Sequence, residues 1–535
     1  MAAQSGLHAA AKDGRQDRIT AALSNGEDPS SLDHAAWTAA EYAAYYGHVG
    51  RLDELQPPNL QDNAAELAFC EGDDVNWLSG YENKSPIDSN VIIVNFGPLD
   101  SVNDERVVEV SSLDDPLTLE VDIKGGSGDK YTLHLPATRA TIYQPCIFRT
   151  SDVSEAKLLF RLHRQGGSAD NIISSGIALV ESLNQPDLED VRRYHRVPLQ
   201  ATHGDLSFAG HVNFYLQVIK PYAGATEAPT NKPAGMDFRN RIGGHRGLGQ
   251  NKQGWKFLQM GENTIESFKM AHQLGAGFVE FDVQVTKDLI PVIYHDFLLS
   301  ETGTDAPIHT VSYEQFMAAS KLQFSPARRD RRVADDSTLA QPQMADFSAR
   351  MGHTLEYKAK GFKPNTRGVF IQDSFTTFKE TLSQVPSDVP FDIEMKYPMP
   401  FECRDHNMST TWLELNVFID TVLSTIFAHA GKRRIMFSSF SPELCIALSH
   451  KQNHYPVFFL SDVKAAPGVD DPRASSLRDA VHFARRWALP GIVVESSPLI
   501  DCPRLVKYVH GFGLQCATYG GRNNEPQCTQ VRDRT

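Results

Sequence analysis

The chain has 535 residues, 22% of them charged, and carries a formal net charge of −14 at pH 7. This acidic balance argues against bulk binding to nucleic acid, and the length predicts roughly two to four domains with large cores. The sequence contains no run of about 18 apolar residues, so we expect no membrane span.

Residues 1–56 contain two helical segments that repeat along the chain. Ser5 and Thr38 lie 33 positions apart, and Gly14 and Gly47 repeat that interval. A period of about 33 resembles ankyrin repeats, which bind protein partners, and a plain pair of helical hairpins is the alternative. Two repeats are too few for a stable array. We therefore expect them to lean on the next domain or to belong to a longer array.

The segment 90–222 has the sequence pattern of a β-rich domain and lies between two linkers, 57–89 and 223–238. Its short apolar runs, separated by turn residues, are 91–94, 107–110, 117–121, 131–135, 158–162, 177–180 and 214–219. This spacing predicts a β-sandwich. We expect a structural module packed beside the following domain, with binding of a lipid surface or a sugar as the alternatives.

Residues 239–535 alternate between strand and helix patterns, which predicts an α/β barrel of the TIM type. The seven strands that we expect are 241–244, 278–285, 391–396, 434–440, 457–460, 491–495 and 514–519. A closed barrel needs eight strands, and no apolar strand follows the seventh. We therefore expect an open edge and consider a truncated gene model as its explanation. The insert 298–367 should lie at the mouth of the barrel as a lid or substrate selector.

Acidic side chains alternate along two of these strands. Glu280 and Asp282 should face the same side of the strand 278–285, about 7 Å apart. Glu394 repeats the pattern on 391–396. Because both faces of a parallel barrel sheet are covered, clustered acids there need a cation. Three oxygen ligands suit a hard divalent ion such as Mg²⁺ or Ca²⁺.

Each polar motif also has an ordinary structural explanation. His245 and Arg246, beside glycines at a strand end, could form a simple turn, and the acids a solvated strand face. His295 could precede an aspartate cap, and Lys396 could be a surface charge. Their occurrence together, in this order and on alternating strand–helix units, is hard to explain by packing alone.

The motifs resemble those of the glycerophosphodiester phosphodiesterase family, which run His-Arg-Gly, Glu-Asn-Thr, Glu-x-Asp, His-Asp and Glu-x-Lys. The resemblance covers about half of the chain, roughly residues 241–524. The segments 350–368 and 517–524 are similar to fungal, ankyrin-bearing glycerophosphocholine phosphodiesterases. The resemblance implies metal-dependent hydrolysis of a glycerophosphodiester substrate, above all of glycerophosphocholine to glycerol 3-phosphate and choline.

The resemblance also implies a role for each residue of the site. It assigns the metal to Glu280, Asp282 and Glu394, acid–base catalysis to His245 and His295, phosphate binding to Arg246 and Lys396, and support to Glu262 and Asn263. The ordinary pKa of histidine, about 6.5, suits either an acid or a base, and which histidine does which job stays open. Choline would be bound by cation–π contacts, for which the nearby aromatic candidates are Trp255, Tyr294, Phe297 and Tyr519.

Two other functions stay open. One is a lysophospholipid or phosphoinositide phosphodiesterase of the same fold, which would need an apolar mouth. The other is a catalytically inactive interaction or phosphate-sensing protein, favoured by the absent strand and opposed by the complete set of motifs. Seven cysteines without paired spacing indicate reduced thiols and a cytoplasmic location, not a disulfide framework or a zinc site.

Overall fold

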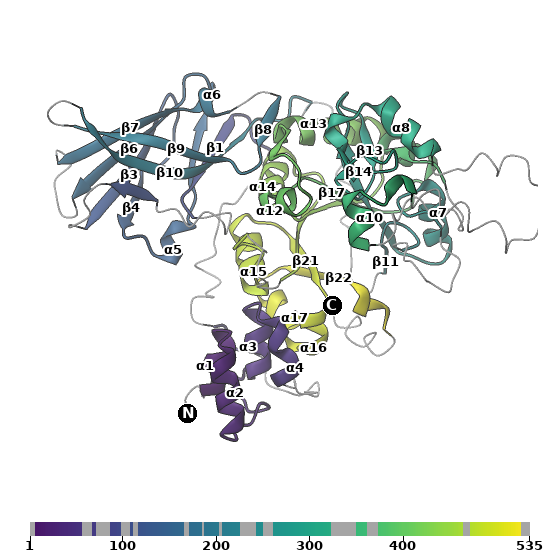
Figure 1. Cartoon of the computed structure of the whole chain (residues 1–535), viewed down its shortest axis with the longest axis horizontal. Coiled ribbons are helices and arrows are strands. Elements are labelled where there is room, and N and C mark those ends of the chain that lie inside the picture. The colour runs from purple at the N-terminus through teal and green to yellow at the C-terminus, as the bar shows by residue number, and fades with distance from the viewer. Residues whose placement is uncertain are drawn as a thin grey trace, which may run out of the picture.

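The computed structural model shows three parts, a set of N-terminal helices, a β-rich domain and a barrel (Figure 1). In that view the helices lie at the bottom, against the C-terminal part of the barrel, and the β-rich domain lies to the left. The structure describes residues 6–55, 67–70, 86–97, 107–110, 116–164, 171–184, 187–202, 206–224, 242–249, 260–322, 349–360, 373–463 and 471–525.

The N-terminal helices pack against the barrel. They are α1 (Gly6–Lys12), α2 (Gln16–Ser24), α3 (Ala39–Tyr45) and α4 (Leu52–Leu55). Thr38 begins α3 in a capping box with Glu41, and every residue of α3 is buried. The burial arises because α3 also contacts α15 (Leu477–Arg486) and α16 (Ser497–Asp501) of the barrel. The prediction was that these helices lean on the next domain, whereas the domain they contact is the barrel, which follows the β-rich domain. Their likeness to ankyrin repeats stays a prediction.

The β-rich domain is built on one path of neighbouring strands, in the order β4-β3-β6-β7-β9-β10-β1-β5, with β2 paired to β10. Its strands are β1 (Asn90–Asn95), β2 (Val108–Val110), β3 (Leu117–Lys124), β4 (Tyr131–Leu135), β5 (Cys146–Thr150), β6 (Lys157–Arg164), β7 (Ile172–Leu179), β9 (Tyr194–Ala201) and β10 (Phe208–Ile219). Buried and partly exposed residues alternate along β3, as the sequence pattern predicts. The inward side chains form a separate core that includes Phe148, Phe160 and Phe214.

The barrel sheet follows the predicted alternation. Its parallel strands in the described residues are β11 (Gly243–Gly244), β12 (Phe278–Val285), β17 (Phe391–Met395), β19 (Ile435–Ser439), β20 (Val457–Ser461), β21 (Gly491–Glu495) and β22 (Gln515–Tyr519). The helices that cover it include α7 (Ile265–Gln273), α11 (Phe378–Gln384), α13 (Leu415–His429), α14 (Pro442–Lys451) and α17 (Arg504–Gly511). These strands follow one another around a nearly closed barrel, and the edge between β22 and β11 stays unpaired within the described ranges.

Two segments beside the site are placed by strand pairing. The segment β13 (Pro291–Ile293), before the His-Asp motif, runs antiparallel to β12 and pairs in turn with β16 (Thr376–Thr377), so it is a hairpin arm. The sequence pattern predicts one long helix from Trp412 to Ala430, yet α13 begins only at Leu415, because β18 (Thr411–Leu413) pairs with β8 (Leu188–Asp190) of the β-rich domain. This long-range pairing overrides the local helical pattern.

Part of the predicted insert 298–367 is a packed layer. The short strands β14 (Leu298–Leu299) and β15 (Ala306–Pro307) pair, and α8 (Tyr313–Lys321) follows them. Phe316 of α8 is fully buried beside Tyr294 and Phe375. This part of the insert therefore forms a small apolar core of its own beside the barrel, whereas residues 323–348 and 361–372 lie outside the described ranges.

Candidate active site

The site begins at the turn that follows β11. A Cβ on Gly244 would lie 2.4 Å from the Gly247 carbonyl oxygen, and a Cβ on Gly247 would lie 2.4 Å from Ser267 Oγ. Only glycine fits this close approach, and Gly247 also has a φ of +90°. The turn sets His245 and Arg246 at the carboxyl end of the barrel strand, where a barrel carries its chemistry.

The three predicted metal ligands lie together. Asp282 on β12 is paired in register with Glu394 on β17, and Glu280 lies two residues before Asp282 on the same face. One carboxylate oxygen from each residue lies within 4.8 Å of the others. The alternate residue Phe281 points the other way and packs on Phe268 of α7. The period-two pattern in the sequence is therefore confirmed in the structure.

The oxygen atoms of this cluster fit a divalent cation. Glu280 Oε1 and Asp282 Oδ1 are buried and have no hydrogen-bond partner. Burial and the nearby carboxylates raise the pKa of Glu280 well above its usual range. A hard ion with oxygen ligands would satisfy both unpaired atoms and remove this repulsion. The residues present thus suit Mg²⁺ or Ca²⁺, and the geometry favours neither over the other.

The two predicted phosphate ligands are buried cations beside these acids. Arg246 is 5% exposed and its Nη1 lies 2.8 Å from Glu262 Oε1. Lys396 is 7% exposed, and its Nζ lies 2.9 Å from Glu394 Oε1 and 4.0 Å from Asp282 Oδ1. Each cation is thus held by a carboxylate while it lies at the edge of the cluster, where an anionic ligand could approach.

The support residues connect the turn to the acids. Asn263 Nδ2 donates a hydrogen bond of 2.8 Å to Asp282 Oδ2, and its backbone N–H donates one of 3.0 Å to the Arg246 carbonyl. The backbone N–H of Arg246 donates to Glu280 Oε2 at 2.8 Å. Arg246 and Asn263 have φ values of 51° and 56°, a sparsely populated region for these residues. The strained backbone is held in place by the same hydrogen bonds that orient the acids.

The two histidines differ in their surroundings. The His245 side chain is 51% exposed, and its Nε2 lies 3.9 Å from Glu280 Oε2. His295 Nδ1 lies 2.8 Å from Asp296 Oδ1. Burial, with the positive charges of Arg246 and Lys396, lowers the pKa of His295 to about 3. His295 is therefore neutral near pH 7, whereas His245 is half-exposed beside Glu280.

Two polar residues that the sequence analysis did not name also belong to the site. Asp392 lies on the inner face of β17 and accepts a hydrogen bond of 2.7 Å from Ser438 Oγ, while burial raises its pKa to about 8. Gln284 Nε2 donates hydrogen bonds of 2.8 Å to the Tyr294 and Asp296 carbonyls and so holds the loop that carries His295. Both follow the same period-two alternation as the acids, which could have identified them.

The four aromatic candidates for choline binding separate into three groups. Trp255 lies outside the described residues. Tyr294 does not line the site, because it is 0% exposed and its ring packs in the core that holds Phe316. Phe297 lies beneath Lys396, with the ring centre 5.2 Å from Nζ, and Tyr519 donates from its hydroxyl to Asp462. Only the last two remain as candidates within the described ranges.

Comparison with known proteins agrees with this geometry. Residues 245–534 match the model of the glycerophosphoryl diester phosphodiesterase family. The chain belongs to this family. Residues 86–223 match the GDE1-like C2 domain, so the β-rich domain is called the C2-like domain from here on. No helix in the described ranges is long and apolar enough to cross a membrane.

Several relatives carry the name glycerophosphocholine phosphodiesterase. GDE1 of Candida albicans is 37% identical over 68% of this chain and 31% of its own length. The gde1 protein of Schizosaccharomyces pombe is 42% identical over 56% of this chain and 27% of its own length. Human GPCPD1 is 31% identical over 53% of this chain and 40% of its own length. The chain thus spans less than half the length of these curated relatives.

Proposed function

We propose that this chain hydrolyses glycerophosphocholine to glycerol 3-phosphate and choline in a metal-dependent reaction. The observation that carries the proposal is the cluster of Glu280, Asp282 and Glu394, which lies beside two histidines and two buried cations. Membership of the family and the names of the relatives support the same reaction.

The three carboxylates would hold one divalent ion. When bound, such an ion neutralises charge on the phosphate oxygens and lowers the pKa of a hydroxyl at the reacting centre. Arg246 and Lys396 would bind the remaining phosphate oxygens, and Asn263 would keep Asp282 in its orientation. The positive groups would stabilise the charge that grows on the phosphate in the transition state.

The surroundings of the histidines suggest their roles. The Nδ1–H of His295 donates to Asp296, which leaves the Nε2 lone pair of the neutral ring to accept a proton from the glycerol hydroxyl that attacks the phosphorus. Water would then open the resulting cyclic phosphate to give glycerol 3-phosphate. His245, half-exposed beside Glu280, would donate a proton to the oxygen of the departing choline. We therefore assign His295 as the base and His245 as the acid.

The choline group would lie against Tyr519 and Phe297. The ring of Tyr519 meets the ring of Phe440 at 5.9 Å, at the carboxyl ends of the barrel strands. The carboxylate of Asp462 accepts a hydrogen bond from the Tyr519 hydroxyl. It would also add negative charge near a quaternary ammonium group. We also propose that the protein is cytoplasmic, since its seven cysteines lack the paired spacing of a disulfide framework, and that α1 and α2 offer a surface to a protein partner.

Release of choline from glycerophosphocholine tests the proposal. The purified protein should release choline with Mg²⁺ or Ca²⁺, and neither the chelated protein nor a folded His295→Ala variant should do so. Release from lysophosphatidylcholine alone would favour the lysophospholipid reaction. No release from any glycerophosphodiester by well-folded protein would contradict the proposal and favour an inactive scaffold.

A further inference from the structure

A two-stranded sheet joins the C2-like domain to the barrel beside the site. Strands β8 and β18 pair antiparallel, with Glu189 opposite Trp412 and Leu188 opposite Leu413. In Figure 1, β8 lies at the barrel side of the C2-like domain, next to α13. Because backbone hydrogen bonds fix the register of two strands, a shift of β8 moves β18 with it.

The Glu189 carboxylate reaches the segment that carries Lys396. It accepts hydrogen bonds from the Tyr397 hydroxyl and from the backbone N–H of Leu415, the latter at 3.2 Å. It also pairs with Arg193 of its own domain. Tyr397 directly follows Lys396, is 2% exposed, and has its hydroxyl 2.8 Å from the Leu413 carbonyl. A carboxylate of the C2-like domain thus holds the neighbour of the predicted phosphate ligand.

A second line of contacts reaches the His295 loop. Trp412 of β18 is 2% exposed, and its ring meets the ring of Phe297 edge-on at 5.9 Å. Phe297 lies two residues after His295, and its ring centre lies 5.2 Å from Lys396 Nζ. Both contact lines begin at the β8–β18 pair and end at residues of the site.

The chemistry of Glu189 favours a geometric role over a stabilising one. A buried carboxylate loses its hydration, and apolar side chains of similar volume often stabilise such a place equally well. Directional hydrogen bonds, by contrast, fix the position of their partners. Glu189 accepts hydrogen bonds both from the backbone that follows β18 and from Tyr397. It therefore fixes how the two domains meet at the site.

We propose that the C2-like domain positions the active site through Glu189, by way of Tyr397 and Trp412. Glu189 is a positioning residue, since none of its hydrogen bonds reaches a predicted metal ligand or histidine. The kinetic part of the proposal rests on the proposed function, whereas the mechanical link between the domains does not.

The test compares Glu189→Gln with a matched control in the same domain. Glu120→Gln alters a carboxylate of β3 that is 16% exposed and bonded to Arg161 at 2.7 Å, against 15% exposure for Glu189. Tyr397→Phe removes the hydroxyl at the other end of the contact without changing a charge. Hydrogen–deuterium exchange of the full chain is measured over residues 295–299 and 391–399, and affinity for inorganic phosphate is measured by calorimetry.

Glu189→Gln and Tyr397→Phe should increase exchange in both segments, whereas Glu120→Gln should not. Loss of a supporting contact should weaken phosphate binding and raise KM for glycerophosphocholine by about tenfold, with a smaller change in kcat. Exchange and phosphate affinity equal to those of Glu120→Gln would overturn the proposal. If the wild type hydrolyses no glycerophosphodiester, the proposed function fails, and the exchange result still decides whether Glu189 holds the site.

Discussion

The barrel meets its two neighbouring parts through interfaces of different chemistry. Its contact with the N-terminal helices is aromatic. Trp37 is 0% exposed, and its ring lies edge-on to Tyr508 of α17 at 4.9 Å. Tyr45 and Phe69 meet the same ring at 5.1 and 5.3 Å. One buried ion pair, Arg504 with Glu41, joins this apolar contact.

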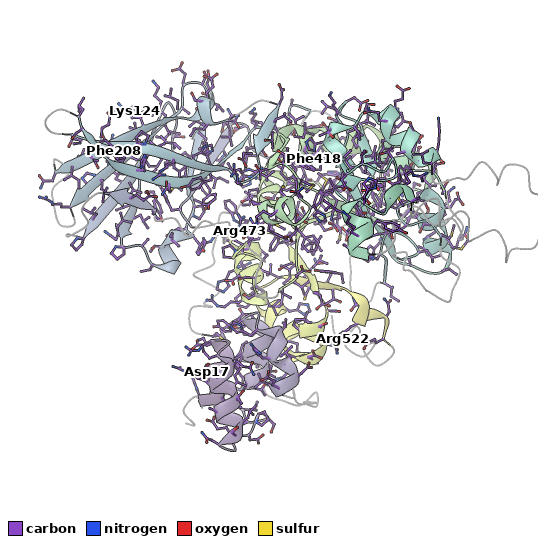
Figure 2. The ribbon with its side chains drawn as sticks, in the orientation of Figure 1. Asp17, Lys124, Phe208, Phe418, Arg473 and Arg522 are labelled. Carbon is purple, nitrogen blue, oxygen red and sulfur yellow. The ribbon has the colours of Figure 1, made fainter. Side chains whose placement is uncertain are left out.

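The contact with the C2-like domain adds hydrogen bonds to apolar packing, in which Val91, Ile219 and Tyr222 share the barrel's core cluster. Gln217 of β10 donates a 2.7 Å hydrogen bond to the carbonyl of Glu443, which pairs within the barrel with Arg473 at 2.6 Å. Lys451, paired within the barrel with Asp420 at 2.8 Å, donates to the Lys220 carbonyl at 2.7 Å. Figure 2 labels Arg473 where the two domains meet.

The two interfaces contribute differently to the stability of the fold and to the orientation of the side chains in the site. Apolar burial is strong but non-directional, so the aromatic contact holds α17 and the nearby edge strand β22 without fixing them finely. Hydrogen bonds and ion pairs are directional, and their net stability when buried is small. The polar interface lies beside Lys396, where orientation matters most. We therefore expect changes at the aromatic interface to lower stability alone, and changes at the polar contacts to alter the site as well.

The largest effect should follow Trp37→Ala. Removal of this fully buried ring should lower the free energy of unfolding by about 3–5 kcal/mol, because a cavity remains between the helices and the barrel. The kcat/KM of the folded protein should stay near the wild-type value. Urea denaturation measures the first quantity. The exposed Phe208→Ala serves as control, and an equal effect of both variants would contradict this account of the aromatic interface.

Arg473→Ala should have the next largest effect. Its loss leaves Glu443 and Asp471 without their shared cation, which should lower the free energy of unfolding by about 3 kcal/mol. Arg192→Ala breaks an exposed ion pair with Asp190 and should change the free energy of unfolding by less than about 1 kcal/mol. Equal values for the two variants, from the same denaturation experiment, would show that the Arg473 ion pairs beside the interface contribute no more than an exposed pair.

A smaller, pH-dependent effect should arise at His309, whose ring lies 3.8 Å from that of Trp412. Burial lowers the pKa of His309 to about 4, and its Nδ1 has no hydrogen-bond partner. The unfolded chain, with a histidine pKa of about 6.5, binds the proton more readily, so stability falls as pH drops from about 6.5 towards 4.

His309→Gln should reduce the loss of unfolding free energy between pH 7 and pH 5 by about 1 kcal/mol, as measured by denaturation at both pH values. The control is His134→Gln, on an exposed position of β4. An identical pH dependence in wild type and His309→Gln would remove His309 as a cause of acid sensitivity near β18.

Local patterns made much of the site predictable. The alternation along β12 and β17 placed Glu280, Asp282 and Glu394 on one face, because a strand has a period of two and parallel strands share an edge. The same pattern reaches Asp392, which the sequence motif passed over. Pairs of this kind depend only on neighbours along the chain and on the order of the strands.

Long-range contacts were the part that the sequence did not reveal. Trp412 lies in a locally helical pattern, yet it forms a strand because β8, more than two hundred residues earlier, pairs with it. Tyr294 follows a strand near the motif, yet its ring turns into the core with Phe316. In both cases packing between distant segments outweighs the local preference.

The central claim is that Glu280, Asp282 and Glu394 bind a divalent ion. Calorimetric titration of the metal-free protein with Mg²⁺ and with Ca²⁺, beside an Asp282→Asn variant, tests it most directly. We predict binding of one ion per chain, weakened at least about tenfold in the variant, which keeps the shape of the side chain but loses its charge. Equal affinity of the wild type and Asp282→Asn for both ions would contradict the claim.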